Sequence, residues 1–418
     1  MNNLPEEILC YILNKLENTV DLINFSVTCK KNRNLILLNK DIFNCRYELN
    51  NKYINEIPKL KLIGKIAIEI SKSHVSYLKM LDSIDLKNID EISITSSEQI
   101  TDVSMLGKVR KLSINNCPEI TDVSMLGDVE ELDLTGCYNI IDVSMLGKVK
   151  KLNLTDCNQI KDVSKLGNCE ELHISCGGFT DISMLSKIKK LEIDDFEYSN
   201  LITDINIFGS CEELGIFSFN EISDISGLAN VKKLTIHDCC NITDVSDLRY
   251  IKYLKISNCS QLSDVSMLGD VEELILSYCD KISDVSMLGK VKKLKLTHCE
   301  NVTDVSKLGN CEELDLTGCD RIKDVSMLGK VKKLKLSYCI NVTDVSKLGN
   351  CVELDLTLCD RIKDVSMLGK VKKLKLSNCK SIKDVSKLGN CEELDLSGCD
   401  GITDVSMLGN VKYLILTY

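Results

Sequence analysis

The sequence has no tryptophan, only three prolines, and only two alanines, Ala67 and Ala229. It also has no run of about 18 uncharged apolar residues, so we expect no membrane-spanning helix. Met1 is followed by polar and acidic residues, unlike a secretory signal. This predicts a protein of the cytoplasm or nucleocytoplasm. With 27% charged and 44% apolar residues, the composition also excludes wholesale disorder.

A 20-residue period runs through most of the 418 residues. The tripeptide Asp-Val-Ser, or a close relative, recurs at this spacing, except for steps of 19 and then 23 residues around 181–204. Self-similarity at this period predicts a solenoid, in which each unit buries its apolar side against its neighbours. The aspartates are Asp102, Asp122, Asp142, Asp162, Asp181, Asp204, Asp224, Asp244, Asp264, Asp284, Asp304, Asp324, Asp344, Asp364, Asp384 and Asp404.

One unit, from Val109 to Leu126, predicts the local structure. Leu112 and Ile114 are separated by one polar residue, which indicates a short strand with both side chains inward. From Cys117 onward, apolar residues recur every third position, which predicts a tight coil with three residues per turn and leaves no room for a long helix. Seventeen such strands are predicted, from Ile92–Ile94 to Leu414–Leu416.

The unit matches the pattern L-x-x-L-x-L-x-x-N/C-x-L and therefore resembles leucine-rich repeats, with cysteine in the Asn/Cys position. The tail I-T-D-V-S-x-L resembles the short repeats of bacterial internalins. The resemblance implies an α/β repeat solenoid forming a right-handed horseshoe or arc. A parallel β-sheet would lie on the concave face, and short 3-10 or turn segments on the convex face. We expect about 16 units over residues 91–418, preceded by a linker and N-terminal cap at 48–90 that includes a strand at 66–70.

Residues 1–47 do not repeat. They open with Leu4-Pro5-Glu6-Glu7-Ile8-Leu9, and the apolar positions 8, 9, 12, 13 and 16 predict an amphipathic helix. Asp21 is placed to cap a second helix. The order of these residues, with Cys29-Lys30 and Ile42-Phe43 after them, resembles the F-box, although Asn32 stands where that family usually has tryptophan.

The F-box resemblance implies a small all-α module that binds a Skp-type adaptor of a cullin–RING ubiquitin ligase. The alternative is that its apolar residues only form the module's own core. The residues that would contact or support the adaptor are Leu4, Pro5, Ile8, Leu9, Leu13, Leu22 and Val27.

Taken together, the two parts resemble F-box/leucine-rich-repeat proteins, with uniform short repeats like those of giant DNA viruses such as mimivirus. In that case the protein would work inside the host cell. The resemblance implies a substrate-recognition subunit of an SCF-type (Skp–cullin–F-box) ubiquitin ligase, whose repeats bind an unknown target protein. The alternative is a scaffold or host-interaction protein with a vestigial F-box.

The 22 cysteines fall mostly into two inward positions of the repeat, so we expect buried thiols that act as small apolar residues. No Cys-x-x-Cys unit occurs, and His74, His173, His237 and His298 keep no ligand spacing. We therefore expect neither metal nor cofactor. For the repeated aspartates we expect hydrogen bonds to turn amides, with calcium binding as the alternative.

The outward residues of six consecutive strands alternate in charge, which predicts a cross-strand ladder of ion pairs: Lys295, Asp315, Lys335, Asp355, Lys375 and Asp395. Such a face lacks the basic stripe that nucleic acid needs. The sequence also shows no nucleophile with a base, and no phosphate-binding loop, so we expect no enzyme.

The outward positions also contain a few aromatic and apolar residues, and binding patches have this composition. The alternative is scattered surface variation. Phe179, Phe196, Phe208 and Phe219 fall in inward positions and are excluded from the patch. We also expect a partner or self-association at the C-terminal edge. The candidate substrate-binding residues are Tyr198, Phe217, Tyr253, Lys255, Ile275, Tyr278 and His298.

Overall fold

A computed structural model describes residues 45–48, 66–71, 86, 89–175, 178–179, 181–195 and 202–417. These residues belong to two compact units, Met1–Leu201 and Ile202–Tyr418. Within both units the described chain forms the predicted leucine-rich-repeat solenoid of parallel strands and 3-10 turns. The proposed adaptor-binding residues and Tyr198 lie outside the described residues.

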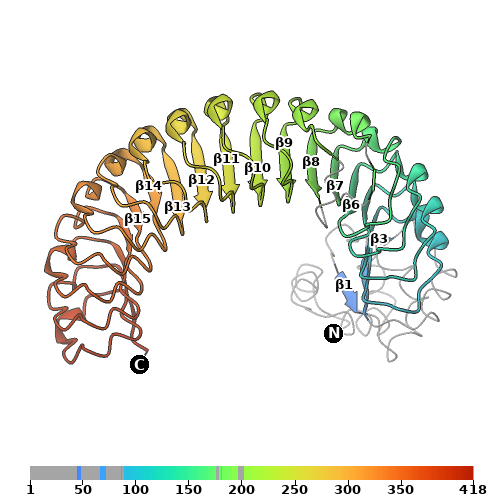
Figure 1. Ribbon diagram of the computed structural model, residues 1–418. Coiled ribbons are helices and arrows are strands. Elements are labelled where there is room, and N and C mark those ends of the chain that lie inside the picture. Colours follow the sequence, from blue (N-terminus) through green and yellow to red (C-terminus); the bar gives the residue numbers. More distant parts are fainter. Residues whose placement is uncertain are drawn as a thin grey trace, which may run out of the picture. The chain divides into compact units, whose positions relative to one another are not determined.

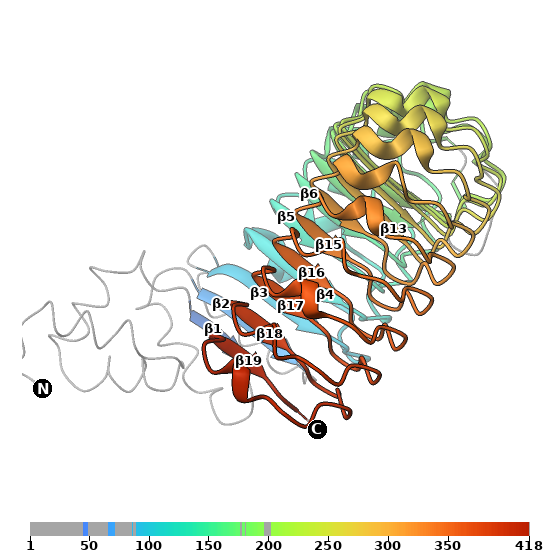
Figure 2. The ribbon, with the colours of Figure 1, turned by 90° about the vertical axis from the view of Figure 1, so that its left-hand side faces the viewer.

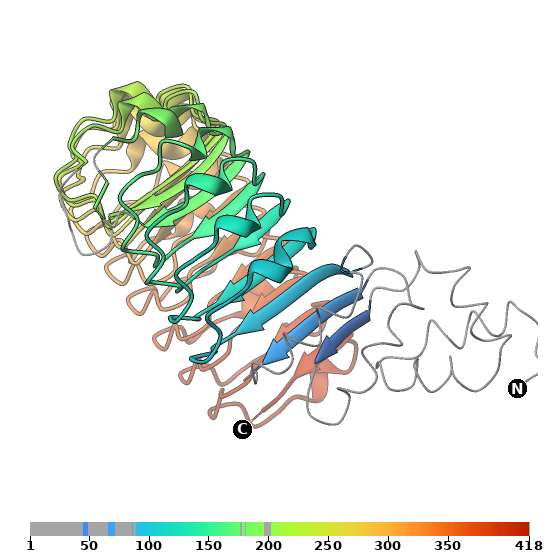
Figure 3. The same ribbon diagram turned by 90° about the vertical axis from the view of Figure 1, so that its right-hand side faces the viewer.

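The first unit contains a parallel sheet in which each strand pairs with the next one along the chain. Its strands run side by side in the same direction (Figure 3, blue to green). The strand predicted at 66–70 is present as β2. The strands are β1 (Cys45–Glu48), β2 (Ile66–Ser71), β3 (Ile89–Thr95), β4 (Lys111–Asn115), β5 (Glu131–Asp133), β6 (Lys151–Leu154), β7 (Glu171–Ser175) and β8 (Lys190–Asp194). The 3-10 helices are η3 (Ser104–Lys108), η4 (Ser124–Leu126), η5 (Ser144–Leu146), η6 (Leu166–Asn168) and η7 (Ser183–Lys187).

The second unit continues the same design, and all its strand pairs are parallel. Its strands lie on the inner, concave side of the unit, with the 3-10 helices on the outer side (Figures 1 and 2). The strands are β9 (Glu213–Phe217), β10 (Lys233–His237), β11 (Tyr253–Ser257), β12 (Glu273–Ser277), β13 (Lys293–Thr297), β14 (Glu313–Asp315), β15 (Lys333–Lys335), β16 (Glu353–Asp355), β17 (Lys373–Lys375), β18 (Glu393–Asp395) and β19 (Tyr413–Ile415). The 3-10 helices are η9 (Asn206–Phe208), η10 (Ser226–Leu228), η11 (Ser246–Tyr250), η12 (Ser266–Asp270), η13 (Ser286–Lys290), η14 (Leu308–Asn310), η15 (Ser326–Leu328), η16 (Ser366–Leu368) and η17 (Ser406–Leu408).

The core of each repeat is a set of apolar columns that run from one repeat to the next. In a typical repeat, Leu314 and Leu316 point inward from the strand and are at most 1% exposed. The three-residue coil that follows is held by hydrogen bonds from inward residues to the carbonyl three residues earlier, as from the N–H of Ile322 to Cys319 at 3.3 Å and from that of Leu328 to Val325 at 3.0 Å. The spacing of three in the sequence is therefore a true three-residue turn. Phe179, Phe208 and Phe219 are buried, as their positions predict.

The repeated aspartates hold the turn that leads toward the next repeat. In one repeat, Oδ1 of Asp324 accepts the backbone N–H of Ser326 at 2.9 Å, and the same bond recurs at Asp304 and Asp344. This hydrogen bond, together with one to the Ser326 side chain, lowers the pKa of Asp324, while the neighbouring aspartates act in the opposite direction. The hydrogen bonds outweigh the repulsion, which confirms the expectation that turn amides offset the stacked charges.

The strands are three residues long from β14 onward, and in β14, β16 and β18 an aspartate in the strand bonds to the chain just beyond it. Oδ1 of Asp315 accepts the N–H of Thr317 at 3.1 Å and its hydroxyl at 2.6 Å. Asp355 forms the same pair of bonds with Thr357. Side-chain bonds of this kind compete with the ladder of the sheet, so β14 and β16 end at their aspartates.

In the part of the chain that the structure describes, no helix has the length and apolar character needed to cross a lipid bilayer.

The glycine found at the end of most 3-10 turns predicts a position-specific loss of stability. A Cβ at Gly329 would lie 2.2 Å from the backbone oxygen of Lys347, whereas a Cβ at Gly409 would meet nothing within 4 Å. Gly329→Ala should therefore lower the free energy of unfolding by about 1–3 kcal/mol, since the backbone must move. Gly409→Ala should change it by less than about 1 kcal/mol. Urea denaturation of both variants checks this, and equal effects would contradict it.

The aspartate turns predict a loss of stability in acid. A carboxyl whose pKa is lowered by folding stabilises the native state above its unfolded pKa, and this stabilisation disappears as the pH falls through the folded pKa. The melting temperature should therefore fall as the pH drops below about 4. Replacing Asp324, Asp344 and Asp364 by Asn keeps the acceptor oxygen but removes the titration. Melting curves of this triple variant should depend less steeply on pH than those of the wild type, and identical slopes would argue against this origin of the acid sensitivity.

Candidate protein-interaction surface

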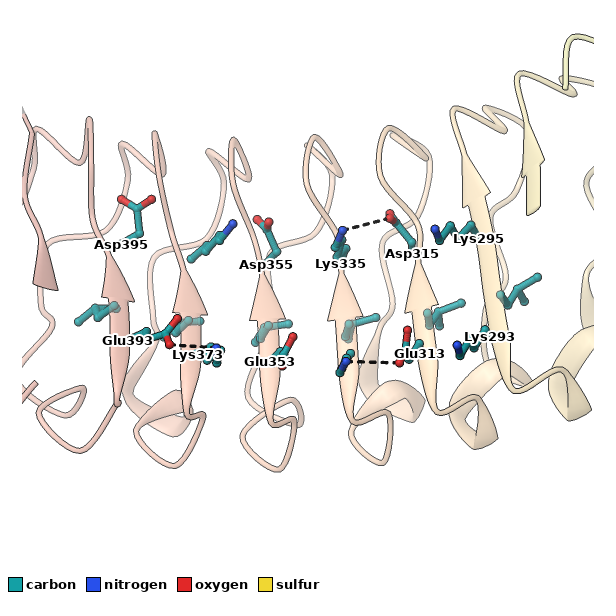
Figure 4. Close-up of a pocket in the computed structure, with 18 of the residues that line it drawn as sticks. Lys293, Lys295, Glu313, Asp315, Lys335, Glu353, Asp355, Lys373, Glu393 and Asp395 are labelled. Atoms are coloured by element: carbon teal, nitrogen blue, oxygen red, sulfur yellow. Dashed lines mark ion pairs between the residues drawn. The ribbon is translucent and has the colours of Figure 1, made fainter. Parts of the chain in front are cut away.

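The concave face of the second unit carries the predicted ladder of alternating charges. Strand register places Asp315 between Lys295 and Lys335, and Glu353 between Lys333 and Lys373. Each of the following lysines pairs with a carboxylate on only one of its two neighbouring strands. Lys335 pairs with Asp315 at 3.7 Å, Lys333 with Glu313 at 3.4 Å, and Lys373 with Glu393 at 2.9 Å (Figure 4). These lysines are about half exposed, so each pair contributes little to stability, and the ladder mainly neutralises the face.

A shallow groove of about 460 Å³ lies over this ladder, with the inward leucines of β13–β18 at its floor and the charged side chains along its walls (Figure 4). Its lining repeats the same two charge types from strand to strand. The groove therefore has no point at which one charge sign gathers.

Five of the seven candidate substrate-binding residues lie on β11–β13 or directly after these strands. Register places Lys255 beside Ile275, and both side chains are half-buried. Tyr253 stands two residues before Lys255 on the same strand, and Lys233 lies 5.5 Å from the centre of its ring. At the other end of the strands, Tyr278 and His298 stack with ring centres 4.7 Å apart and planes within 5°. We call these five residues, Tyr253, Lys255, Ile275, Tyr278 and His298, the concave patch.

The backbone accounts for the position of the stacked pair. Tyr278 and His298 both have φ of +54°, a left-handed conformation that is costly for a bulky side chain. Their N–H groups donate to the carbonyls of Thr297 and Thr317 on the next repeat. The ring of His298 extends over Gly318, where an added Cβ would lie 2.3 Å from Nδ1. The repeat ladder thus holds two aromatic rings at the end of the sheet, where they can contact a partner.

Phe217 is further away, on β9, and is half-buried beside His237, with ring centres 6.2 Å apart. It therefore lies two strands from β11 and is not part of the concave patch. Whether any of these residues binds a substrate stays a prediction.

Two features of this surface were not found from the sequence pattern. Lys233 contacts the ring of Tyr253, although lysine at this strand position looked like an ordinary member of the ladder. A second exposed apolar group, Tyr338 and Ile340, follows β15 at 52% and 43% exposure. In the sequence, this group is indicated by apolar residues at two nearby loop positions where other repeats often have polar ones.

In the first unit the same face also pairs charges between strands. Arg110 pairs with Asp90 at 2.6 Å, Lys111 with Glu131 at 2.7 Å, and His173 with Glu192 at 2.7 Å. The bond to Glu192 raises the pKa of His173. Within the described residues, no cluster of three or more His, Cys, Asp or Glu side chains is arranged to hold a metal ion.

The cysteines of the described repeats are free thiols and, except for Cys240, buried. They form the predicted inward columns, and many donate to a carbonyl of the preceding repeat, as from Cys319 to Leu296 at 2.8 Å. Burial raises the pKa of Cys319 to about 12. A thiol in this state is a poor nucleophile and a poor metal ligand, so the columns serve packing.

Comparison with known proteins adds a family for the N-terminal region, where the model of the F-box domain matches residues 1–44. A search of curated proteins found no match. Among solved structures, the chain is similar to an internalin (InlF) of Listeria monocytogenes at 18% identity and a TM-score of 0.36, over 87% of this chain and 93% of that one. It is also similar to a leucine-rich-repeat protein of Leptospira interrogans at 17% identity and a TM-score of 0.44, over 84% and 87% of the two chains. A third similar structure is the functional domain of InlJ from Listeria monocytogenes, which includes a cysteine ladder, at 21% identity and a TM-score of 0.38 over 81% and 69%.

The thiol columns predict a difference in reactivity between two adjacent residues. Cys239 is fully buried with its pKa raised to about 12, whereas its neighbour Cys240 is half-buried. In the native protein at pH 8, iodoacetamide should modify Cys240 well before Cys239, and urea should abolish the difference. Fragment-ion mass spectrometry of the one tryptic peptide that contains both measures this ratio directly. Equal rates in the native protein would contradict the burial of the column.

Proposed function

Because this chain is an F-box/leucine-rich-repeat protein, we propose that it is the substrate-recognition subunit of an SCF-type ubiquitin ligase. F-box domains in general bind Skp-type adaptors, and leucine-rich repeats act in protein interaction. A chain with both can hold the adaptor at one end and a second protein on its repeats. Its contribution to catalysis would be proximity, since it would bring the target to the ubiquitin-carrying enzyme.

The observation that carries the proposal is the F-box match at residues 1–44, directly before the sheet that begins at β1. On the adaptor side we propose Leu4, Pro5 and the apolar residues that follow them in the predicted helices. On the target side we propose the concave patch, because it combines aromatic rings, of which that of Tyr278 is exposed, with a lysine on a face that is otherwise neutralised.

The partners that follow are a Skp-type adaptor, the cullin of the ligase, and an unidentified protein substrate. The location that follows is the cytoplasm or nucleocytoplasm, where reduced thiols like those of the repeat columns persist. Self-association through β19 remains a separate proposal, supported by the exposed side chains of Tyr413 and Ile415 at 59% and 50%.

The adaptor interaction is tested with the full chain and a purified Skp-type adaptor in a pull-down and a titration. Leu4→Asp with Pro5→Ala should weaken adaptor binding about tenfold or more, the effect expected for interface anchors. Lys335→Gln with Lys375→Gln, on the neutralised ladder, serves as the matched control and should leave adaptor binding unchanged. If the wild-type chain does not bind the adaptor, the ligase role is lost and a scaffold or host-interaction role takes its place.

A further inference from the structure

The outward charges of the sheet alternate from strand to strand, and the alternation is interrupted at one strand. At two equivalent positions of the repeat, β3, β5 and β7 carry carboxylates, as in Glu130 and Glu131, while β4, β6 and β8 carry basic residues, as in Lys150 and Lys151. In the second unit, β9 is acidic and β10 basic, and from β12 to β18 acidic and basic strands alternate again.

The strand that interrupts the alternation is β11. An acidic strand is expected there, but Lys252 comes directly before the strand, and the outward residues of the strand include Tyr253 and Lys255. Two lysine-bearing strands, β10 and β11, therefore lie side by side. The next acidic strand is β12, which would be basic if the alternation had continued without interruption. Among the described strands of the second unit, this is the only place where two basic strands are neighbours.

The ion pairs in this region involve the lysines of β10 and not those of β11. On β10, Lys232 and Lys233 pair backward to Glu212 and Glu213 on β9, at 3.5 and 3.3 Å. Register places Lys255 between Thr235 and Ile275, neither of which carries a charge. Neither Lys252 nor Lys255 forms an ion pair with a described residue.

A second lysine lies on the far side of Ile275. Lys295 on β13 is the register neighbour of Ile275. On the next strand its register neighbour is Asp315, which pairs with Lys335 rather than with Lys295 (Figure 4). Lys255 and Lys295 thus flank an apolar side chain and lie two strands apart, which is about 10 Å at the usual strand spacing. Aromatic rings border this row on both sides, Tyr253 at one end of the strands and the Tyr278–His298 stack at the other.

We propose that the concave patch binds an acidic, extended segment of a partner protein, with two carboxylates about 10 Å apart reaching Lys255 and Lys295. In a polyproline II conformation, residues i and i+3 share a face and lie about 9 Å apart, which matches this spacing. An aromatic or aliphatic residue near these two carboxylates would contact Ile275 and the stacked rings. This inference rests on the proposed target-binding role and specifies the chemistry of its target.

Charge complementarity favours an acidic protein segment over nucleic acid. A nucleic-acid strand needs a continuous row of basic residues along its phosphates. Here Glu213 and Glu273 border β10 and β11, and Asp315 follows Lys295, so a long phosphate chain would meet carboxylates on both sides of the patch. A short segment with two acidic residues avoids them.

The test is a selection of 12-residue peptides displayed on phage against the full chain, followed by affinity measurement of the selected peptides by fluorescence anisotropy. The wild type should enrich peptides with acidic residues three positions apart next to an aromatic or aliphatic residue. Lys255→Gln with Lys295→Gln should weaken these peptides about tenfold. Lys335→Gln with Lys375→Gln removes two lysines that have carboxylates on both sides, and it should weaken the same peptides by less than about twofold.

Three results would overturn the inference: no enrichment of acidic peptides, an equal loss in both double variants, or tighter binding of a 20-nucleotide single-stranded DNA than of the selected peptides. Circular dichroism of both variants separates loss of binding from loss of fold.

Adaptor binding of the same wild-type preparation is measured in parallel. If it is intact while acidic peptides fail, this inference alone falls, whereas loss of adaptor binding removes the ligase role and leaves the peptide result standing.

Discussion

The structure depends on the stacking of equivalent positions from one repeat on those of the next. A 20-residue unit of this kind cannot bury its own apolar side, so Leu, Ile, Val and Cys side chains pack against the same positions of neighbouring repeats. Parallel pairing without register shifts in the repeats then places every outward side chain beside its equivalent, about 4.8 Å away. Any charge in the unit therefore becomes a column of charges, and each column needs a means of offsetting its own repulsion.

The protein uses two such means. In the turn column every residue is an aspartate, and backbone N–H groups such as that of Ser326 stabilise the ionised carboxylates. On the sheet, lysine and carboxylate alternate, so unlike charges become neighbours. The second means has a consequence for function, because a neutralised ladder attracts no charged partner. Binding specificity is then expected where the alternation is interrupted, and β11 is such a place.

The sequence predicted much of the fold, because one period determines it. The inward columns, the three-residue coil, the strands at 20-residue spacing and the alternating neighbours of Asp315 all follow from position alone. Which of two neighbouring strands supplies the partner of an ion pair does not follow from position. Lys333 pairs with Glu313 rather than Glu353, although the period makes the two equivalent.

The site was harder to predict than the fold, because it depends on departures from the repeat. The candidate list included Tyr278 and His298 for their residue types, but their left-handed backbone and parallel stacking require coordinates. Asn258 in the same column is a residue type that tolerates this conformation, while Tyr278 gives no such indication. The contact of Lys233 with Tyr253 depends on a side-chain choice that strand spacing leaves open.

The central claim is that recognition occurs where the charge alternation is interrupted on the concave face. Photo-crosslinking tests it most directly, with benzoylphenylalanine placed at Tyr253 in one variant and at Tyr250 in another. Tyr250 belongs to the same repeat but lies on η11 and is 72% exposed, so it samples a surface of this repeat outside the sheet. The account predicts that crosslinks from position 253 in living cells reach an acidic protein segment, and that crosslinks from position 250 do not. Equal capture from both positions, or capture of the acidic segment from position 250 alone, would contradict it.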